Sequence, residues 1–354
     1  MVKIILDDTK VKQALYPFTA NRHAADIRIG ILTIREKWSF LHRFQVETAI
    51  GSFFLDNHSD QNSSVAIFDA NLIPTLDWLN GLAFPVASKN IVEGDSIRQL
   101  NYPWQIFQYN DWAIRKDFEM ITNGRRSQPI SPSNRVIGNE NIFLEEGAKV
   151  EHTILNASTG PIYIGKNAEI MEGCMVRGPF ALCESAVLKM GTKVYGATTI
   201  GPFCVAAGEI KNSVLFDHSN KAHDGYLGDS VIGSWCNLGA GTTNSNLKNT
   251  AGQVKVWFNA ANEYVEVGDK CGLLMGDYSR SAINTSFTTG SVIGLCCHIF
   301  GEHFPPKWVS NFTWGKERYI FDKLLVDINN WKKLKGSKLT EQETETLQQL
   351  YSQL

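Results

Sequence analysis

The chain has 354 residues, of which 43% are hydrophobic and 20% charged, and this suits two or three globular domains with a large buried core. The formal net charge is −2 at pH 7, so the charge balance does not steer the protein toward nucleic acid or an acidic membrane. The opening residues turn acidic too early for a signal peptide, no apolar run approaches a membrane span, and the seven scattered cysteines suit a reducing cytoplasm.

Residues 1–125 have the pattern of a truncated α/β domain. Segments 3–6 and 65–69 read as strands, and segment 27–44 combines a strand-like piece with a helix-like piece. Asn110 or Asp111 can cap a helix, which then continues through Ile114, Phe118 and Ile121. Residues 126–135, rich in proline and serine, are predicted to form a linker.

Apolar residues recur at every sixth position in the next region. They are Ile164, Ile170, Val176, Leu182, Leu188, Val194 and Ile200. An α-helix repeats after about 3.6 residues and a flat strand after about 2, so neither produces this period. A triangular β-coil does, because each side takes one repeat and points one residue to the axis. Residues 136–304 are therefore predicted to form a left-handed parallel β-helix, and the fold class is mainly β.

The repeat changes phase at about residues 207–226 and 244–265. It returns at Ile232 and Leu238, and again around Val267 and Val292. In a solenoid, insertions of this kind map to loops at one edge, where function usually lies. We therefore expect two loops that project from the coil.

Residues 305–354 are predicted to form a helical tail. Segment 303–306 contains two prolines and should interrupt regular structure. Helices are then expected over residues 319–335 and 341–354. Thr340 is followed by Glu343 three residues later, which is the signature of a capping box at the start of the second helix.

Two segments of the coil carry a family resemblance. They read KAHDGYLGD at residues 221–229 and NLGAGT at residues 237–242. Together with residues 188–191 and 209–211, they closely resemble the acetyltransferase domain of the bifunctional hexapeptide-repeat enzymes with glucosamine-1-phosphate N-acetyltransferase and UDP-N-acetylglucosamine diphosphorylase activities. Segments 245–247, 254–256 and 282–287 look more like archaeal-type sugar-1-phosphate nucleotidylyltransferase/acetyltransferases. The resemblance covers about residues 136–300.

The N-terminal block is similar to the start of sugar nucleotidyltransferases, through LYPFT at residues 15–19, then Arg22 and residues 32–33. The layout looks like a divergent subgroup with a shortened first domain. Residues 6–8 read Leu-Asp-Asp where the family has a glycine-rich loop, and bulky side chains there keep backbone N–H groups away from a triphosphate. A degenerate nucleotidyltransferase is expected. If it is active, the resemblance assigns phosphate contacts to Arg22 and Lys37, and Mg²⁺ to Asp69.

The resemblance implies acetyl transfer from acetyl-CoA to the amine of an amino sugar-1-phosphate. The attacking amine must lose a proton, and an imidazole has a suitable pKa, so His223 is the predicted general base. Lys189 and Lys211 are expected to neutralise the sugar phosphate. The other predicted contacts are Tyr226, Asn237, Asn246 and Lys255 for the substrate, and Gly239, Ala240 and Gly241 for the pantetheine arm. Tyr226, Asn237, Asn246 and the small residues could instead be structural.

In the family, such coils pack as trimers, and the acyl-CoA site lies between neighbouring coils. The resemblance therefore implies a cytoplasmic homotrimer that binds a sugar phosphate and CoA, without nucleic-acid or membrane partners. The sequence leaves open whether the sugar is glucosamine-1-phosphate, galactosamine-1-phosphate or a nucleotide-linked amino sugar.

Three alternatives remain at this stage. The first is an active bifunctional enzyme that also transfers a uridylyl or thymidylyl group. The second is a trimeric scaffold that binds a sugar nucleotide without catalysis. The third is a γ-type zinc enzyme on the same coil, since His218 and His223 are five residues apart, as are His298 and His303, although a catalytic zinc needs three protein ligands.

Overall fold

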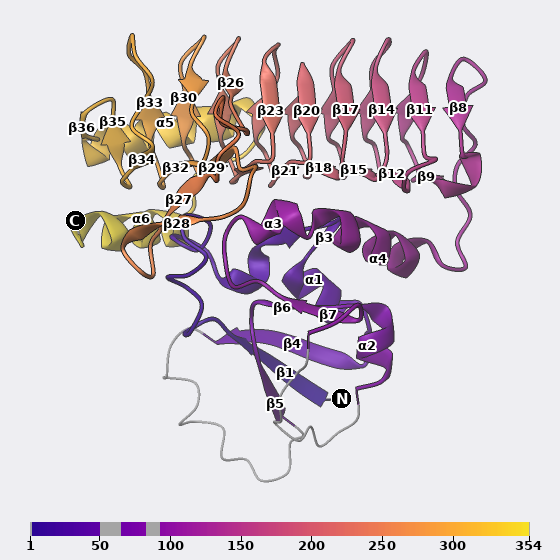
Figure 1. Cartoon of the computed structure of the whole chain (residues 1–354). Coiled ribbons are helices and arrows are strands. Elements are labelled where there is room, and N and C mark those ends of the chain that lie inside the picture. The colour runs from indigo at the N-terminus through magenta and orange to yellow at the C-terminus, as the bar shows by residue number, and fades with distance from the viewer. Residues whose placement is uncertain (1, 50–64, 83–92, 354) are drawn as a thin grey trace.

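The structure is a computed structural model that describes residues 2–49, 65–82 and 93–353. Figure 1 shows a long coil with the N-terminal block packed along one of its sides. The coil consists of three parallel sheets, which form the three sides of a triangular solenoid of about ten turns. The predicted mainly-β solenoid with an N-terminal α/β block and a helical tail is confirmed.

The three sides differ in length and in what covers them. The nine-stranded side faces the N-terminal block and contains β9 (Ile142–Leu144), β12 (Ile162–Ile164), β15 (Phe180–Leu182), β18 (Thr198–Ile200), β21 (Val214–Leu215), β24 (Val231–Ile232), β29 (Leu273–Met275), β32 (Ser291–Ile293) and β34 (Trp308–Val309).

The ten-stranded side is partly covered by the C-terminal tail. It contains β10 (Lys149–Val150), β13 (Glu169–Ile170), β16 (Val187–Leu188), β19 (Val205–Ala206), β22 (Asn220–Lys221), β25 (Asn237–Leu238), β30 (Arg280–Ser281), β33 (His298–Ile299), β35 (Thr313–Trp314) and β36 (Glu317–Arg318). All its pairs are parallel except the terminal pair β35–β36.

The six-stranded side contains β8 (Arg135–Ile137), β11 (Ile154–Asn156), β14 (Met175–Arg177), β17 (Lys193–Tyr195), β20 (Glu209–Lys211) and β23 (Tyr226–Gly228). A short parallel pair, β26 (Thr243–Asn244) with β31 (Ser286–Phe287), follows it along the coil. A 3-10 turn, η3 (Asn139–Asn141), lies in the first turn of the coil.

The six-residue period marks the side chains that point to the axis. Successive members of the series from Ile164 to Ile200 fall on the nine-, ten- and six-stranded sides in rotation, and each is at most 2% exposed. In-register stacking of the coils therefore builds one continuous apolar core. Each fully buried aliphatic side chain of this kind contributes about 1.5–3 kcal/mol.

The first phase break is not an inserted loop, so that expectation was wrong. Residues 207–226 contain β20, β21 and β22 as ordinary coil strands. The period changes because the corners are shorter: the axis-facing Ile210 follows Ala206 by four residues, and Leu215 follows Ile210 by five. A corner can lose residues without losing a strand, because corner residues carry no side chain of the core.

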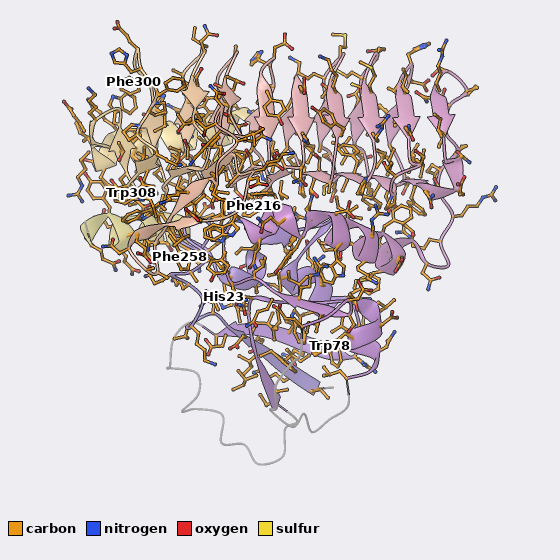
Figure 2. The ribbon with its side chains drawn as sticks, in the orientation of Figure 1. His23, Trp78, Phe216, Phe258, Phe300 and Trp308 are labelled. Carbon is orange, nitrogen blue, oxygen red and sulfur yellow. The ribbon has the colours of Figure 1, made fainter. Side chains whose placement is uncertain are left out.

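The second phase break is an insertion. It contains the antiparallel hairpin of β27 (Lys255–Phe258) and β28 (Glu263–Glu266). Val254 and Val256 are fully buried in a core shared with the N-terminal block. The hairpin therefore fills the junction between coil and block, and Figure 2 shows Phe216, Phe258 and Trp308 gathered at this junction.

The N-terminal block is built around a small parallel sheet in the order β4 (Phe44–Ala49), β1 (Val2–Asp7), β5 (Val65–Asp69). Two antiparallel pairs accompany it, β2 (Arg28–Ile29) with β3 (Leu32–Thr33) and β6 (Leu72–Pro74) with β7 (Ile97–Gln99). The helical elements are η1 (Ala24–Asp26), α1 (Ile34–Ser39), α2 (Leu76–Asn80), α3 (Gln105–Gln108) and α4 (Asn110–Thr122).

Asn110 joins the block to the coil. The sequence suggested a helix cap at this position, but Asn110 lies inside the first turn of α4 and its side chain caps nothing. Instead, its amide oxygen accepts from the N–H of Gly30 at 2.8 Å and from the hydroxyl of Thr199 at 3.2 Å, and its amide nitrogen donates to the carbonyl of Ala197 at 3.0 Å. The side chain is fully buried, so these bonds lie away from solvent.

The tail contains α5 (Phe321–Leu334) and α6 (Glu341–Ser352). The predicted capping box of Thr340 and Glu343 is present. The coil strands reach Trp314, beyond the expected limit at residue 304, because Pro305 and Pro306 occupy a corner loop where the ladder needs no N–H donor. Over the described residues, no helix is long and apolar enough to cross a membrane.

We expect Asn110→Ala to lower the free energy of unfolding by about 2–4 kcal/mol, because the N–H of Gly30 and the carbonyl of Ala197 would lose buried partners. Urea denaturation followed by tryptophan fluorescence would measure the loss. Gln108→Ala removes an exposed amide two residues away and should change stability by less than about 0.5 kcal/mol. Equal effects of the two substitutions would contradict the role given to Asn110.

Candidate active site

His223 lies in an exposed corner loop. The loop connects β22 on the ten-stranded side to β23 on the six-stranded side. Its backbone is fixed by the neighbouring coils: the N–H of Gly241 donates to the carbonyl of Asp224 at 3.2 Å, and the N–H of Glu209 donates to the carbonyl of Gly225, also at 3.2 Å. The imidazole is therefore presented to solvent from a well-supported turn.

The six-stranded side continues from this corner and carries outward-facing polar side chains. In one ladder Lys193, Glu209 and Tyr226 are register partners. In the other, Tyr195 is the partner of Lys211. The hydroxyl of Tyr195 donates to Glu209 at 2.5 Å, and the ammonium of Lys211 lies 5.9 Å from the centre of the Tyr195 ring. These contacts fix Lys211 on β20, one strand before the end of the six-stranded sheet.

A second polar network surrounds Tyr226. The amide nitrogen of Asn246 donates to the Tyr226 hydroxyl at 3.1 Å and also to Asp229. The amide nitrogen of Asn212 donates to the other oxygen of Asp229 at 2.6 Å. The Tyr226 ring folds back over Gly228, where an added Cβ would lie 2.2 Å from the hydroxyl oxygen. The structure therefore brings together the predicted residues Tyr226 and Asn246, with Lys211 beside Gly228 in register, whereas His223 lies in the corner that precedes Tyr226.

Both tyrosines are kept as neutral phenols. Burial and the neighbouring Asp229 carboxylate raise the pKa of Tyr226 well above its usual value. The hydrogen bond to Glu209 raises the pKa of Tyr195 to about 12. Because the Tyr226 oxygen already accepts from Asn246, its own hydrogen is free to be donated to an oxygen of a bound molecule.

Lys189 and Asn237 lie farther from this cluster. Lys189 follows β16, two strands before the His223 strand on the ten-stranded side. Asn237 lies on β25 of that same side, where it accepts from the amide of Asn220 at 3.5 Å and pairs in register with Arg280. Asn237 therefore faces outward from a different side of the triangle than Tyr226.

Gly239, Ala240 and Gly241 form the corner that follows the His223 loop. A Cβ on Gly239 would lie 2.5 Å from backbone atoms of Ala282, and one on Gly241 would lie 2.2 Å from the side-chain oxygen of Asn284. Both added carbons would collide with the next coil rather than fill open space. Gly239 is therefore required for coil stacking because its neighbour is backbone, whereas Gly241 is favoured by its left-handed φ of 73°.

The residues predicted to bind a nucleotide are used in packing. Arg22 forms an ion pair with Asp277 of the coil and lies over the Phe216 ring at 4.9 Å. Lys37 forms a buried ion pair with Asp117 of α4. Neither is exposed at a surface where phosphate could bind, so the structure does not place them in a nucleotide site.

Asp69 and Lys255 also lie apart from the cluster. Asp69 ends β5, next to Asp7 in register, and accepts from Lys10 at 3.2 Å. Lys255 is exposed on the inserted hairpin and lies 3.7 Å from Glu266. The hairpin packs against the N-terminal block, so Lys255 is not brought to the corner of His223.

The histidine pairs considered for zinc lie at separate places. His218 is at the opposite end of β22 from His223, stacked between the rings of Phe203 and Trp235, and 2.8 Å from Asp217. His298 lies within β33, whereas His303 lies in the corner loop after it. Within residues 2–49, 65–82 and 93–353, no group of three or more His, Cys, Asp or Glu side chains is arranged to hold a metal ion.

Sequence reasoning missed Tyr195, Glu209, Asn212 and Asp229, which support the predicted residues. The signal was present: Tyr195 and Glu209 each directly flank an axis-facing residue and must therefore point outward. Their pairing depends on which coils are neighbours. The shortened corners made that register unreadable from the six-residue period alone.

Comparisons with known proteins agree with this layout. A family model described as sugar nucleotidyl transferase matches residues 3–83. The bifunctional protein GlmU of Methanocaldococcus jannaschii is 33% identical over 118 residues, which are 33% of this chain and 28% of that protein. The bifunctional sugar-1-phosphate nucleotidylyltransferase/acetyltransferase of Sulfurisphaera tokodaii is 30% identical over 205 residues, which cover 56% of this chain and 43% of that protein. The GlmU of Methanococcus maripaludis is 30% identical over 195 residues, which cover 55% of this chain and 41% of that protein.

These matches confirm the predicted resemblance to the bifunctional nucleotidylyltransferase/acetyltransferases. The chain spans less than half the length of these relatives.

Gly239→Ala should destabilise the protein by about 1–3 kcal/mol, because the new methyl group would overpack against the backbone of Ala282. Gly252→Ala is the control: a Cβ there would meet its nearest atom at 3.6 Å, and stability should stay within about 0.5 kcal/mol. Thermal unfolding of both variants would decide. A fully stable Gly239→Ala protein would mean that the glycine is not needed for stacking.

Proposed function

We propose that this relative of the bifunctional nucleotidylyltransferase/acetyltransferases is an acetyl-CoA-dependent N-acetyltransferase acting on an amino sugar-1-phosphate such as glucosamine-1-phosphate. The observation that carries the proposal is the exposed imidazole of His223 at the end of a sheet face that presents Lys211, Tyr226 and Asn246. The relative from Sulfurisphaera tokodaii supports the proposal, since its name describes a sugar-1-phosphate nucleotidylyltransferase and an acetyltransferase.

The reaction forms an amide bond and breaks a thioester. The amine of the sugar attacks the acetyl carbon, the thiolate of CoA leaves, and the proton of the amine passes to the base. We assign the role of base to His223, because its side chain is exposed at the corner and the residues that follow it, Asp224 and Gly225, are bonded to the neighbouring coils.

The acceptor would lie on the six-stranded side beside this corner. Lys211 supplies a positive charge for the sugar phosphate, and the Tyr226 hydroxyl supplies a donor. Glu209 and Asp229 balance these groups but are already hydrogen-bonded to Tyr195, Asn212 and Asn246, which limits their repulsion of phosphate.

The donor would lie along the corner edge that runs from His223 toward the C-terminus. Ile283 is 69% exposed and Phe300 is 45% exposed there, and Figure 2 shows Phe300 at the edge of the coil remote from the N-terminal block. A cavity of 300 Å³ adjoins them, lined by residues 284–286 and 299–305. This partly apolar track suits a pantetheine arm. A second copy of the chain would cover it in a homotrimer.

The test is acetyl-CoA consumption by the purified protein with glucosamine-1-phosphate, galactosamine-1-phosphate and UDP-linked amino sugars. We expect turnover with one of the sugar-1-phosphates, and His223→Ala should lower kcat by about a hundredfold to ten-thousandfold. Lys211→Ala should act mainly through KM, because its contact with phosphate is the same in the ground and transition states.

The fold should survive His223→Ala, since the exposed side chain adds little to the core. A folded His223→Ala enzyme with normal kcat would eliminate the base assignment. Wild-type protein that consumes no acetyl-CoA with any of these acceptors would leave the coil as a scaffold.

The structure of the N-terminal block supports the proposal that its nucleotidyltransferase activity is weak or lost. After β1, the carboxylate of Asp8 is buried and accepts from the N–H of Ala24 at 3.2 Å, with His23 at 3.5 Å. A carboxylate thus fills the place where the family presents N–H groups to phosphate. Asp69 is held by Lys10, so these residues do not fit a magnesium ion as they stand.

We therefore expect UTP-dependent pyrophosphate release, with N-acetylglucosamine-1-phosphate and Mg²⁺ present, to stay below about 0.01 per second, far under ordinary enzyme turnover of about 1–1,000 per second. Asp69→Asn is the control, because a genuine magnesium-dependent activity should fall in that variant while a contaminant should not. Rapid release that Asp69→Asn abolishes would establish an active bifunctional enzyme.

A further inference from the structure

Lys221 occupies a position that the coil otherwise gives to small or aliphatic side chains. It is the second residue of β22, and its register partner is Ala206, which faces the axis. Leu188 holds the same position on the strand before that. Lys221 itself is fully buried, so its long side chain runs through the interior of the coil.

The ammonium group of Lys221 returns to the corner that carries His223. It donates to the backbone carbonyl of His223, and to that of Asp224 at 3.1 Å. It also lies 3.5 Å from the carbonyl of Ala207, in the corner of the preceding coil. One buried cation thus joins the His223 loop to its neighbour from the inside.

This arrangement is costly for folding. Burial lowers the pKa of Lys221 to about 8, and the Asp224 carboxylate only partly opposes that effect. The protonated amine is therefore less favourable in the folded state than in the unfolded state, although it stays mostly protonated at pH 7, whereas an aliphatic side chain would carry no such penalty. A lysine at an axis-facing position that otherwise holds small or aliphatic residues lowers stability, and a residue kept at such a cost indicates a function.

We propose that Lys221 is a positioning residue that fixes the backbone of the His223 loop, and through it the direction of the imidazole. This inference rests on the proposed function of His223 as the base. Lys221 does not touch the substrate, so its effect reaches the reaction only through His223.

The experiment compares Lys221→Met with Leu188→Met, which places methionine at the same axis-facing position two strands away. Lys221→Met should keep or raise Tm. It should lower kcat about tenfold to a hundredfold, with KM for the sugar phosphate within about twofold, as expected when catalytic geometry rather than binding is disturbed. Leu188→Met should keep normal kcat. In a His223→Ala background, Lys221→Met should cause no further loss.

Hydrogen exchange measured by mass spectrometry provides a test that needs no activity. The amides of Gly241 and Glu209, which donate to the carbonyls of Asp224 and Gly225, should exchange at least about tenfold faster in Lys221→Met than in Leu188→Met, because the loop loses its anchor. Unchanged exchange would overturn the proposal. The proposal would also be overturned if Lys221→Met lowered kcat equally in the wild-type and in the His223→Ala background. Wild-type protein without acetyl transfer would overturn the proposed function instead, and the exchange rates would still show whether Lys221 holds the loop.

Discussion

The structure depends on one constraint: every side of every coil must place a side chain on the axis in register with the coils before and after it. Parallel strands stack about 4.8 Å apart, so a side chain of the wrong size or polarity meets two neighbours at once. The series from Ile164 to Ile200 satisfies this constraint at regular intervals. Where the spacing shortens, as between Ala206 and Ile210, the chain removes corner residues and keeps the axial ones.

The corners of the coil hold bulky side chains that do not fit on the axis-facing positions of its sides. Bulky residues adopt left-handed backbone conformations along one edge, with φ of 59° at Phe203, 60° at His218 and 59° at Trp235. That conformation costs about 1–2 kcal/mol for a residue with a side chain. Here the rings stack on one another, with centroids 4.8 and 4.1 Å apart, and Lys332 of α5 lies over Trp235. The opposite end of β22 carries His223, so one corner is used for packing and the other is left open for chemistry.

The sequence predicted the core because its repeat is local, and the family resemblance predicted Lys189, Lys211, His223 and Tyr226 around one loop, of which Lys189 lies on another side of the coil. Their actual neighbours depend on long-range register. Glu209 meets Tyr195 only because the coils between them are short, and Asn110 meets Thr199 only because the N-terminal block docks on the nine-stranded side. No periodicity encodes that docking. Arg22, which the resemblance assigns to a phosphate, pairs with Asp277 of the coil, and Lys37 forms a buried pair with Asp117 of its own block.

Docking of the N-terminal block to the coil and binding of a nucleotide phosphate would both use Arg22. Arg22 cannot leave Asp277 for a phosphate without leaving a carboxylate that is 4% exposed and has lost its cationic partner, and breaking a buried pair in this way costs about 3–5 kcal/mol. Asp8 is also held, but within the block, by the N–H of Ala24 at 3.2 Å and by His23 at 3.5 Å. Of the two cationic residues that the resemblance assigns to a phosphate, Arg22 is thus the one that docking to the coil uses. The block covers the nine-stranded side of the coil and does not cover the six-stranded side beside His223.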